Sequence, residues 1–182
     1  KQHLELCRDI AQKFNNDFEV TNFLKTPEPL IQKQFSRIMS LKDGLKKMSK
    51  SDPSDLSRIN LTDEKDIISN KIKKAKTDPK SMPTNIKDLV GRPEAENLLG
   101  IYSSIKNQGL EKSITEFNGK QFSEFKEKLS EVVIGKIEPI SKEIKRLLND
   151  ERYIDEILLD GSEKADKIAT QKIKKIKELV GF

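Results

Sequence analysis

Apolar residues recur at intervals of three and four from about residue 61 onward, and this spacing constrains the fold more than any other feature of the sequence. Such intervals place side chains on one face of an α-helix. The longest periodic stretch runs from Phe122 to Leu148 and contains Pro139, so we expect a long helix that this proline kinks or splits. The sequence therefore predicts a mainly α-helical protein, whose C-terminal two-thirds form a bundle of about five helices joined by short connections.

Capping signals delimit the other helices of this region. Thr62 or Asp63 is expected to cap one helix, and Pro93 suits the first turn of the next. A short turn is expected over residues 110–117. Beyond the long helix, we expect one helix that Gly161 closes and a last one that starts at Ser162. The residues expected to face inward are Ile68, Ile72 and Ala75; Ala95, Leu98, Leu99, Tyr102 and Ile105; Tyr153, Ile154, Ile157 and Leu158; and Ala165, Ala169, Ile173, Ile176 and Val180.

The first sixty residues are less regular. Residues 1–14 have helical spacing, whereas residues 17–34 contain two prolines and are expected to form a loop. Residues 35–41 alternate in a way that favours a short strand. Residues 42–57 are rich in Lys, Ser and Asp and are expected to form an exposed, mobile loop.

Composition excludes several classes of protein. The single Cys7 rules out a disulfide framework, a thiolate zinc site and a cysteine-held iron–sulfur cluster, and no metal site is expected. No apolar run approaches the roughly 18 residues of a membrane span and no export signal is seen, so we expect a cytoplasmic protein without membrane contact. The net charge of +5 favours a polyanionic partner, although a generally lysine-rich composition explains it equally well.

One pentapeptide carries a chemical signal: Lys47-Met48-Ser49-Lys50-Ser51. Two lysines three positions apart on a flexible loop can converge on one polyphosphate, with serine hydroxyls and backbone N–H groups in support. A solvated loop is the alternative reading. A shuffled chain of this composition would contain the pentapeptide only about five times in ten thousand.

The pentapeptide resembles the KMSKS signature of class I aminoacyl-tRNA synthetases, and its surroundings are similar to bacterial tryptophanyl-tRNA synthetases. The similar blocks, in the order of that family, are Lys1-Gln2-His3-Leu4-Glu5-Leu6 with Arg8-Asp9; Arg37-Ile38-Met39-Ser40-Leu41 with Asp43, the signature and Asp52-Pro53; Asn97-Leu98-Leu99 with Ile101-Tyr102; Val132-Val133-Ile134; and Glu163-Lys164-Ala165. Tyrosine-specific relatives usually carry a different version of the signature, which favours tryptophan. The resemblance implies that residues 1–57 are the end of a nucleotide-binding Rossmann domain and residues 58–182 a helical anticodon-binding domain.

The resemblance also implies a reaction and roles. Such enzymes activate tryptophan with ATP to tryptophanyl-adenylate, release pyrophosphate and transfer the amino acid to tRNA(Trp), with Mg²⁺ accompanying the phosphates. Lys47 and Lys50 would be catalytic, stabilising the charge on the leaving pyrophosphate. Gly44 stands where the family often has proline and is expected to loosen the entry of the loop. The residues expected to bind ATP are Ile38, whose backbone would flank the adenine, and Lys47, Met48, Ser49, Lys50 and Ser51.

Binding of tRNA is expected in the helical domain, where Arg152 and Tyr153 are candidates to stack on anticodon bases and Lys172 and Lys175 to face phosphates. Members of the family are homodimers. The sequence lacks the family's HIGH signature, tryptophan pocket and GxDQ segment and begins without Met, so we expect a fragment that cannot form the adenylate alone. Two alternatives stay open: a stand-alone helical RNA-binding or interaction module, and a fragment of a tyrosine-specific synthetase.

Overall fold

The structure is a computed structural model that describes residues 2–30 and 37–182. The chain divides into two compact units, which are considered separately: Lys1–Gln32 together with Arg152–Phe182, and Lys33–Glu151. No described helix is both long enough and apolar enough for a membrane span. The expected functional division after residue 57 remains a prediction.

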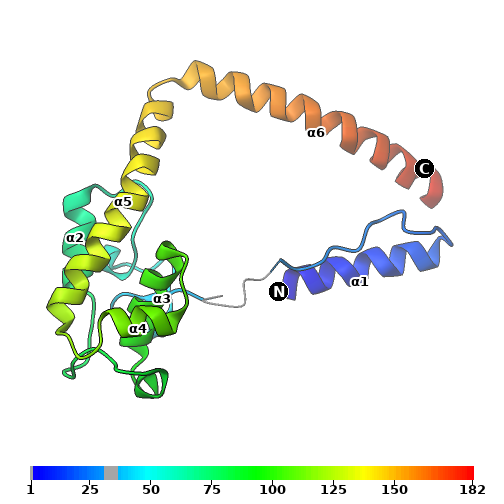
Figure 1. Ribbon diagram of the computed structural model, residues 1–182. Coiled ribbons are helices and arrows are strands. Elements are labelled where there is room, and N and C mark those ends of the chain that lie inside the picture. The colour runs from blue at the N-terminus through cyan, green and yellow to red at the C-terminus, as the bar shows by residue number, and fades with distance from the viewer. Residues whose placement is uncertain (1, 31–36) are drawn as a thin grey trace. The chain divides into compact units, whose positions relative to one another are not determined.

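The unit Lys33–Glu151 is a small helical assembly with one β-hairpin, and Figure 1 shows its long helix α5 running along α2. Helix α5 packs on both α2 and α3, and α3 also packs on α4 and on strand β2. The predicted mainly helical architecture is confirmed. Its elements are β1 (Met39–Ser40), β2 (Asp43–Lys47), the 3-10 turn η1 (Asp55–Ser57), α2 (Lys65–Lys74), the 3-10 turn η2 (Ile86–Leu89), α3 (Pro93–Lys106), α4 (Leu110–Glu116) and α5 (Phe122–Leu148).

The core of this unit lies where α2, α3, α4 and the first half of α5 meet. Three aromatic rings form its centre, with Phe117 edge-on to Tyr102 at 5.0 Å and to Phe125 at 4.8 Å between ring centroids. Such edge-to-face pairs add to the free energy gained by burying the rings. The inward faces predicted for α2 and α3 are confirmed. Fully or nearly fully buried on them are Ile68, Ile72, Ala75, Ala95, Leu98, Leu99 and Tyr102, and Ile105 is partly buried.

The hairpin corrects the expectation for residues 42–57. Strand β2 occupies five of them, pairing antiparallel with β1 so that Met39 faces Lys47 and Ser40 faces Asp43. The sequence of β2 lacks apolar alternation, and its extended conformation comes from backbone pairing and from packing on α3. Of the strand predicted over residues 35–41, Phe35 and Ser36 lie outside the described residues, and the observed strand is Met39–Ser40.

Two smaller expectations for the helices are wrong, and of the kink or split expected at Pro139 the split is wrong. The N-cap of α2 is Glu64, not Thr62 or Asp63, and it makes no side-chain capping bond. Residues 110–117, expected as a turn, contain α4. Pro139 does not split the long helix, because α5 continues through it to Leu148.

The other unit contains α1 (Gln2–Asp17), the irregular segment 18–30 and α6 (Glu151–Val180). Asn15 closes the turn after α1 by bonding both main-chain groups of Leu24, donating to its carbonyl at 2.8 Å and accepting from its N–H at 2.9 Å. The Phe14 ring lies against those of Phe18 and Phe23. The predicted opening helix is confirmed, and so is the absence of helix in the described part of residues 17–34 beyond Asp17.

Helix α6 differs from its prediction in two respects. It runs unbroken through Gly161, because glycine inside a helix costs only about 1 kcal/mol relative to alanine. None of its described side chains is fully buried: Ile154 and Ile176, both expected to face inward, are half-buried, whereas Ile157 and Ile173 are 52% and 51% exposed.

Candidate active site

The signature pentapeptide begins at the end of the β-hairpin. Lys47 is the last residue of β2 and lies opposite Met39 on β1. The next residue extends the pairing, because the Met48 N–H donates to the Ile38 carbonyl at 3.1 Å. The structure thus brings together Ile38 and the signature, two parts of the predicted ATP site that are ten positions apart in the sequence.

The hairpin is attached to α3 through a buried amide. The Met39 N–H donates to Asn97 Oδ1 at 2.9 Å, and Asn97 Nδ2 donates to the Met39 carbonyl at 3.1 Å. The side chain of Asn97 therefore bonds β1 as a neighbouring strand would, and it fixes the strand that faces Lys47.

Gly44 gives the hairpin a second close contact with α3. A Cβ at this position would lie 2.6 Å from the Pro93 carbonyl carbon and from the Glu94 nitrogen, so no larger residue fits without displacing the backbone. The expectation that Gly44 loosens the entry of the loop is wrong, since the residue lies within β2 and is buried against the start of α3. Beside it, a hydrogen bond from Lys76 lowers the pKa of Glu94, helped by the Gly44 backbone and opposed by burial.

Within the signature loop, defined here as residues 48–51, the hydrogen bonds of residues 49–51 are short-range. The Ser49 and Ser51 hydroxyls lie 2.9 Å apart, and the Ser51 N–H donates to Ser49 Oγ at 3.3 Å. The Asp52 N–H donates to the Ser49 carbonyl at 3.4 Å. These bonds form a tight polar turn that presents its hydroxyl groups to solvent.

Lys47, directly before this turn, and Lys50, within it, are both exposed. No carboxylate of the described residues forms an ion pair with either of them, whereas the neighbouring Lys46 lies 3.9 Å from Asp43. Two cations without a counter-ion among the described residues, next to two exposed hydroxyls, form a site suited to a polyphosphate. The described residues contain no group of three or more His, Cys, Asp or Glu placed to hold a metal ion.

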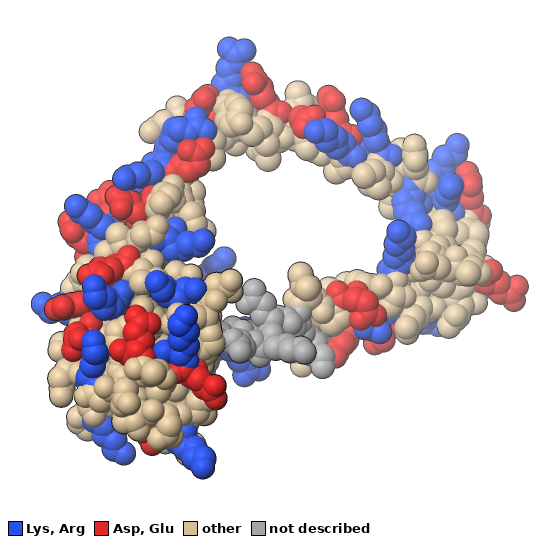
Figure 2. Space-filling view, viewed as in Figure 1, with Lys and Arg blue, Asp and Glu red and all other residues tan. Residues whose placement is uncertain are grey.

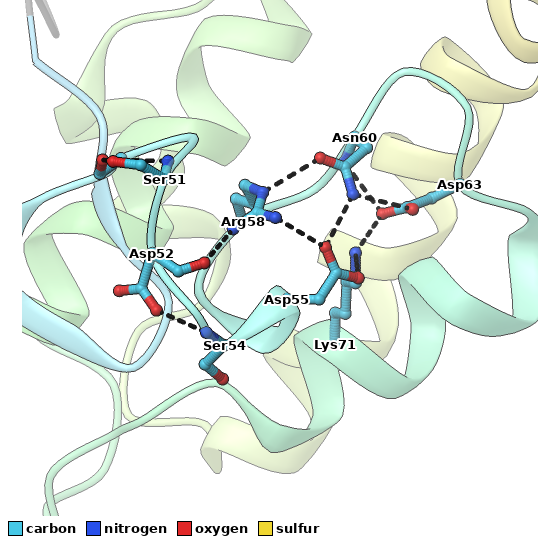
Figure 3. A network of polar contacts seen from close by, with 9 residues as sticks. Ser51, Asp52, Ser54, Asp55, Arg58, Asn60, Asp63 and Lys71 are labelled. Atoms are coloured by element: carbon cyan, nitrogen blue, oxygen red, sulfur yellow. Dashed lines mark hydrogen bonds and ion pairs between the residues drawn. The ribbon is translucent and has the colours of Figure 1, made fainter.

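A charged network lies beyond the signature, and sequence reasoning missed it. Figure 3 shows Arg58 between Asp52 and Asp55, with Asn60, Asp63 and Lys71 completing the cluster. Lys71 is only 2% exposed although it lies on a helix rich in lysine. Its place at i+3 from the buried Ile68, on the apolar face of α2, is the one sequence signal that pointed to its burial.

The four residues predicted to contact tRNA lie on α6 in different environments. Arg152 is exposed and pairs with Glu156 at 3.1 Å, and Tyr153 is 42% exposed. Lys172 donates to the Phe23 carbonyl, and its ammonium group lies 3.7 Å from the centroid of the Phe23 ring. Lys172 and Lys175 both line a pocket of about 830 Å³ bordered by α1 and residues 22–27.

Charge is mixed over the helical surfaces. Figure 2 shows Lys and Arg interspersed with Asp and Glu on the face in view, with no large area of one sign. On α6, Lys164 pairs with Asp160 at 2.6 Å. In this view the positive charge of the chain is therefore not gathered into one basic surface.

Comparison with known proteins gives a consistent result. The family model described as tRNA synthetases class I (W and Y) matches residues 1–136. The tryptophan–tRNA ligase of Brucella melitensis is 46% identical over an alignment of 200 residues that covers 100% of this chain and 56% of that protein. The tryptophan–tRNA ligase of Rickettsia felis is 50% identical over 182 residues, covering 100% of this chain and 54% of that protein.

Solved structures give the same picture. The tryptophanyl-tRNA synthetase of Mycoplasma pneumoniae superposes with a TM-score of 0.81 at 26% identity, covering 100% of this chain and 53% of that one. That of Campylobacter jejuni, solved in complex with ADP and tryptophan, superposes with a TM-score of 0.67 at 26% identity, covering 100% and 54%. The chain thus spans about half the length of the relatives it matches.

Proposed function

The chain belongs to the class I tRNA synthetases of the tryptophan and tyrosine group, and we propose that it is the C-terminal portion of a tryptophan–tRNA ligase. The whole enzyme would activate tryptophan with ATP and transfer it to tRNA(Trp). Identity of 46–50% to tryptophan–tRNA ligases across the entire chain supports tryptophan over tyrosine. The single observation that carries the proposal is the intact signature loop at the end of a hairpin, with Lys47 and Lys50 exposed and in no ion pair with an acid of residues 2–30 and 37–182.

The chemical role of the two lysines follows from their placement. As tryptophan attacks the α-phosphorus of ATP, negative charge grows on the departing pyrophosphate, and ammonium groups placed beside it lower the free energy of the transition state. Lys47 is fixed by the β ladder, whereas Lys50 lies in the turn and can move with it. Mg²⁺ would enter with the ATP phosphates and share the neutralisation of their charge.

The other residues of the signature would bind ATP through their polar groups. The hydroxyls of Ser49 and Ser51 are exposed and already bonded to each other, so they can exchange that bond for phosphate oxygens. The backbone of Ile38 would flank the adenine, with Met48 paired to it. The 182 residues contain no HIGH signature, and we propose that they form no adenylate by themselves.

Partners and location follow from the same proposal. The helical part of the chain would contact tRNA(Trp), with Arg152, Tyr153, Lys172 and Lys175 as candidate residues. The whole enzyme would be a cytoplasmic homodimer. The domain division after residue 57 would separate its nucleotide-binding part from its anticodon-binding part.

The test is tryptophan-dependent exchange between ATP and pyrophosphate, measured on the full-length protein. Lys47→Ala and Lys50→Ala are each expected to lower kcat on the order of a hundredfold with the fold intact. Lys46→Ala, the neighbouring residue on the same strand, is the matched control and is expected to leave kcat unchanged. Exchange with tyrosine in place of tryptophan would identify the tyrosine enzyme, and exchange with neither would favour the RNA-binding module.

A further inference from the structure

Asp52 follows the signature loop, and its main-chain carbonyl accepts a hydrogen bond from a side chain outside the loop. Arg58 Nη1 donates to the Asp52 carbonyl at 3.0 Å. Arg58 is also bonded through its other nitrogens, with Nε donating to Asn60 Oδ1 at 3.2 Å and Nη2 lying 3.2 Å from Asp55 Oδ1. Only 18% of its side chain is exposed, so its orientation is constrained by packing as well as by these bonds.

The partners of Arg58 are themselves held by a buried lysine of α2. Lys71 Nζ lies 2.6 Å from Asp55 Oδ2 and 2.5 Å from Asp63 Oδ2, and its side chain is 2% exposed. Asn60 connects the two carboxylates, donating from Nδ2 to Asp55 at 2.9 Å and to Asp63 at 3.3 Å. The hydrogen bond from Lys71, followed by that from Asn60, lowers the pKa of Asp55.

Within the cluster, the cations Arg58 and Lys71 contact the carboxylates of Asp55 and Asp63, and Lys71 is attached to the core. Ile68 and Ile72, on either side of Lys71 in α2, are completely buried. A continuous series of bonds therefore joins the Asp52 main chain to a rigid helix through Arg58, Asp55 and Lys71, as Figure 3 shows.

We propose that Arg58 is a positioning residue for the signature loop, fixing the loop's C-terminal end to α2 so that Lys50 reaches the phosphates in the correct geometry. The proposal rests on the proposed function. Residues 49–51, bonded mainly to one another, would change conformation around the nucleotide, while Asp52 stays in place and sets how far the turn can move.

Lysine cannot replace arginine in this role. The planar guanidinium of Arg58 uses three nitrogens to bond a carbonyl, a carboxylate and an amide at the same time. A lysine ammonium group is a single centre on a flexible stem and cannot span three acceptors in that arrangement. Arg58→Lys therefore keeps the charge of the cluster and removes the link to Asp52.

A double-mutant cycle on the full-length protein tests the proposal, with tryptophan-dependent ATP–pyrophosphate exchange as the assay. Arg58→Lys is expected to lower kcat about tenfold or more and to leave KM for tryptophan unchanged. If Arg58 acts through Lys50, the double variant with Lys50→Ala is no slower than Lys50→Ala alone. Multiplicative losses in the double variant would overturn the proposal.

Arg92→Lys is the matched control, because Arg92 also joins a carboxylate, Asp78 at 2.9 Å, to a main-chain carbonyl, that of Ser81 at 2.7 Å. Arg92→Lys is expected to lower Tm. Any fold-loss in kcat that it causes is expected to multiply with the fold-loss caused by Lys50→Ala in the double variant. Suppose instead that Arg92→Lys lowers kcat as much as Arg58→Lys does, and that its loss also fails to multiply with that of Lys50→Ala. The effect would then come from general packing, and the proposal would be overturned. Asp55→Asn, which interrupts the link without touching Arg58 or Asp52, is the second variant and is expected to show the same non-multiplicative behaviour as Arg58→Lys.

Hydrogen–deuterium exchange separates this proposal from the proposed function, because it needs no catalysis. Amides of residues 48–54 are expected to exchange faster in Arg58→Lys and at the wild-type rate in Arg92→Lys. Unchanged exchange in Arg58→Lys would overturn the link itself. Faster exchange in a protein whose wild type shows no tryptophan-dependent activity would show that the proposed function had failed while the structural link was correct.

Discussion

Asn97 of α3 bonds both the N–H and the carbonyl of Met39, at 2.9 and 3.1 Å, and so completes the hairpin that carries the signature. A side chain of one helix thereby takes the place of a third strand. The two-stranded ribbon gains a fixed attachment that a hairpin of this length does not have alone.

Removing that amide is expected to weaken the hairpin and the activity together. Asn97→Ala leaves two main-chain groups of Met39 without partners, at a cost of about 1–3 kcal/mol for each that stays out of water. We expect a lower free energy of unfolding in urea and a lower kcat for adenylate formation in the full-length protein. Asn70→Ala, on the exposed face of α2, is the control. If kcat survived in Asn97→Ala, the attachment would have no bearing on the site.

Gly44 is expected to tolerate no side chain. Gly44→Ala forces a methyl group against the backbone of Pro93 and Glu94, where contacts of 2.6 Å cannot relax by side-chain rotation. Overpacking of this kind destabilises by about 1–3 kcal/mol. Chemical denaturation measures the effect, with Gly135→Ala as the matched control, because a Cβ there meets nothing within 4 Å. Gly135→Ala should stabilise α5 by up to about 1 kcal/mol.

The continuity of α6 predicts the opposite effect at Gly161. A Cβ at this position meets nothing within 4 Å, so Gly161→Ala is expected to raise helicity and Tm, by up to about 1 kcal/mol in free energy. Gly181→Ala, where φ is +94°, should lower both quantities. Circular dichroism during thermal unfolding distinguishes the two. Lower helicity in Gly161→Ala would mean that the helix breaks there in solution.

Lys71 is expected to be essential to its unit, because removing one member of a buried ion pair leaves the other charge unsolvated. Lys71→Met should cost about 3–5 kcal/mol in unfolding free energy. Adding Asp63→Asn should recover part of that loss, because an uncharged amide then replaces the carboxylate that Lys71→Met leaves without its cation. A double variant less stable than Lys71→Met would contradict the pairing.

Acid should weaken the same unit through Asp78. Burial acts to raise the pKa of this carboxyl group, but hydrogen bonds from Arg92 and from the Lys80 N–H outweigh it, and the pKa is lowered. A carboxyl group with a lowered folded-state pKa contributes stability above its unfolded value, about 4, which is lost as pH falls through the folded value. Urea titrations from pH 6 down to pH 2 should show a smaller loss of stability for Asp78→Asn than for the wild type. Equal losses would show that Asp78 is not the group responsible.

The sequence predicted the buried faces of α2 and α3 well, and it predicted the faces of α6 and the charged contacts poorly. The spacing of Ile68, Ile72, Leu98 and Leu99 identified the core, because burial of apolar area dominates packing and leaves a periodic trace. Strand β2 was missed because its conformation is imposed by β1 and α3. Its own residues give no strand pattern.

The charged cluster left no comparable trace. In a chain with 36% charged residues, Lys71, the one lysine that is buried in the part of the chain that the structure describes, looks like the many that are solvated. The signature lysines were found only because their pattern is a known motif. Arg58 and Lys71 became visible only when distant residues were brought together by the fold.

The bonds between Met39 and Asn97 also determine when, during translation, the hairpin can be attached to the helical unit. The two residues are 58 positions apart, so the ribosome has translated the whole signature long before it reaches the residue that fixes its hairpin. A nascent chain that ends before α3 carries the lysines without the arrangement that gives them their chemistry. The attachment of the hairpin can therefore form only after α3 has left the exit tunnel, and the nucleotide binding that we propose for this site would wait for that step of synthesis.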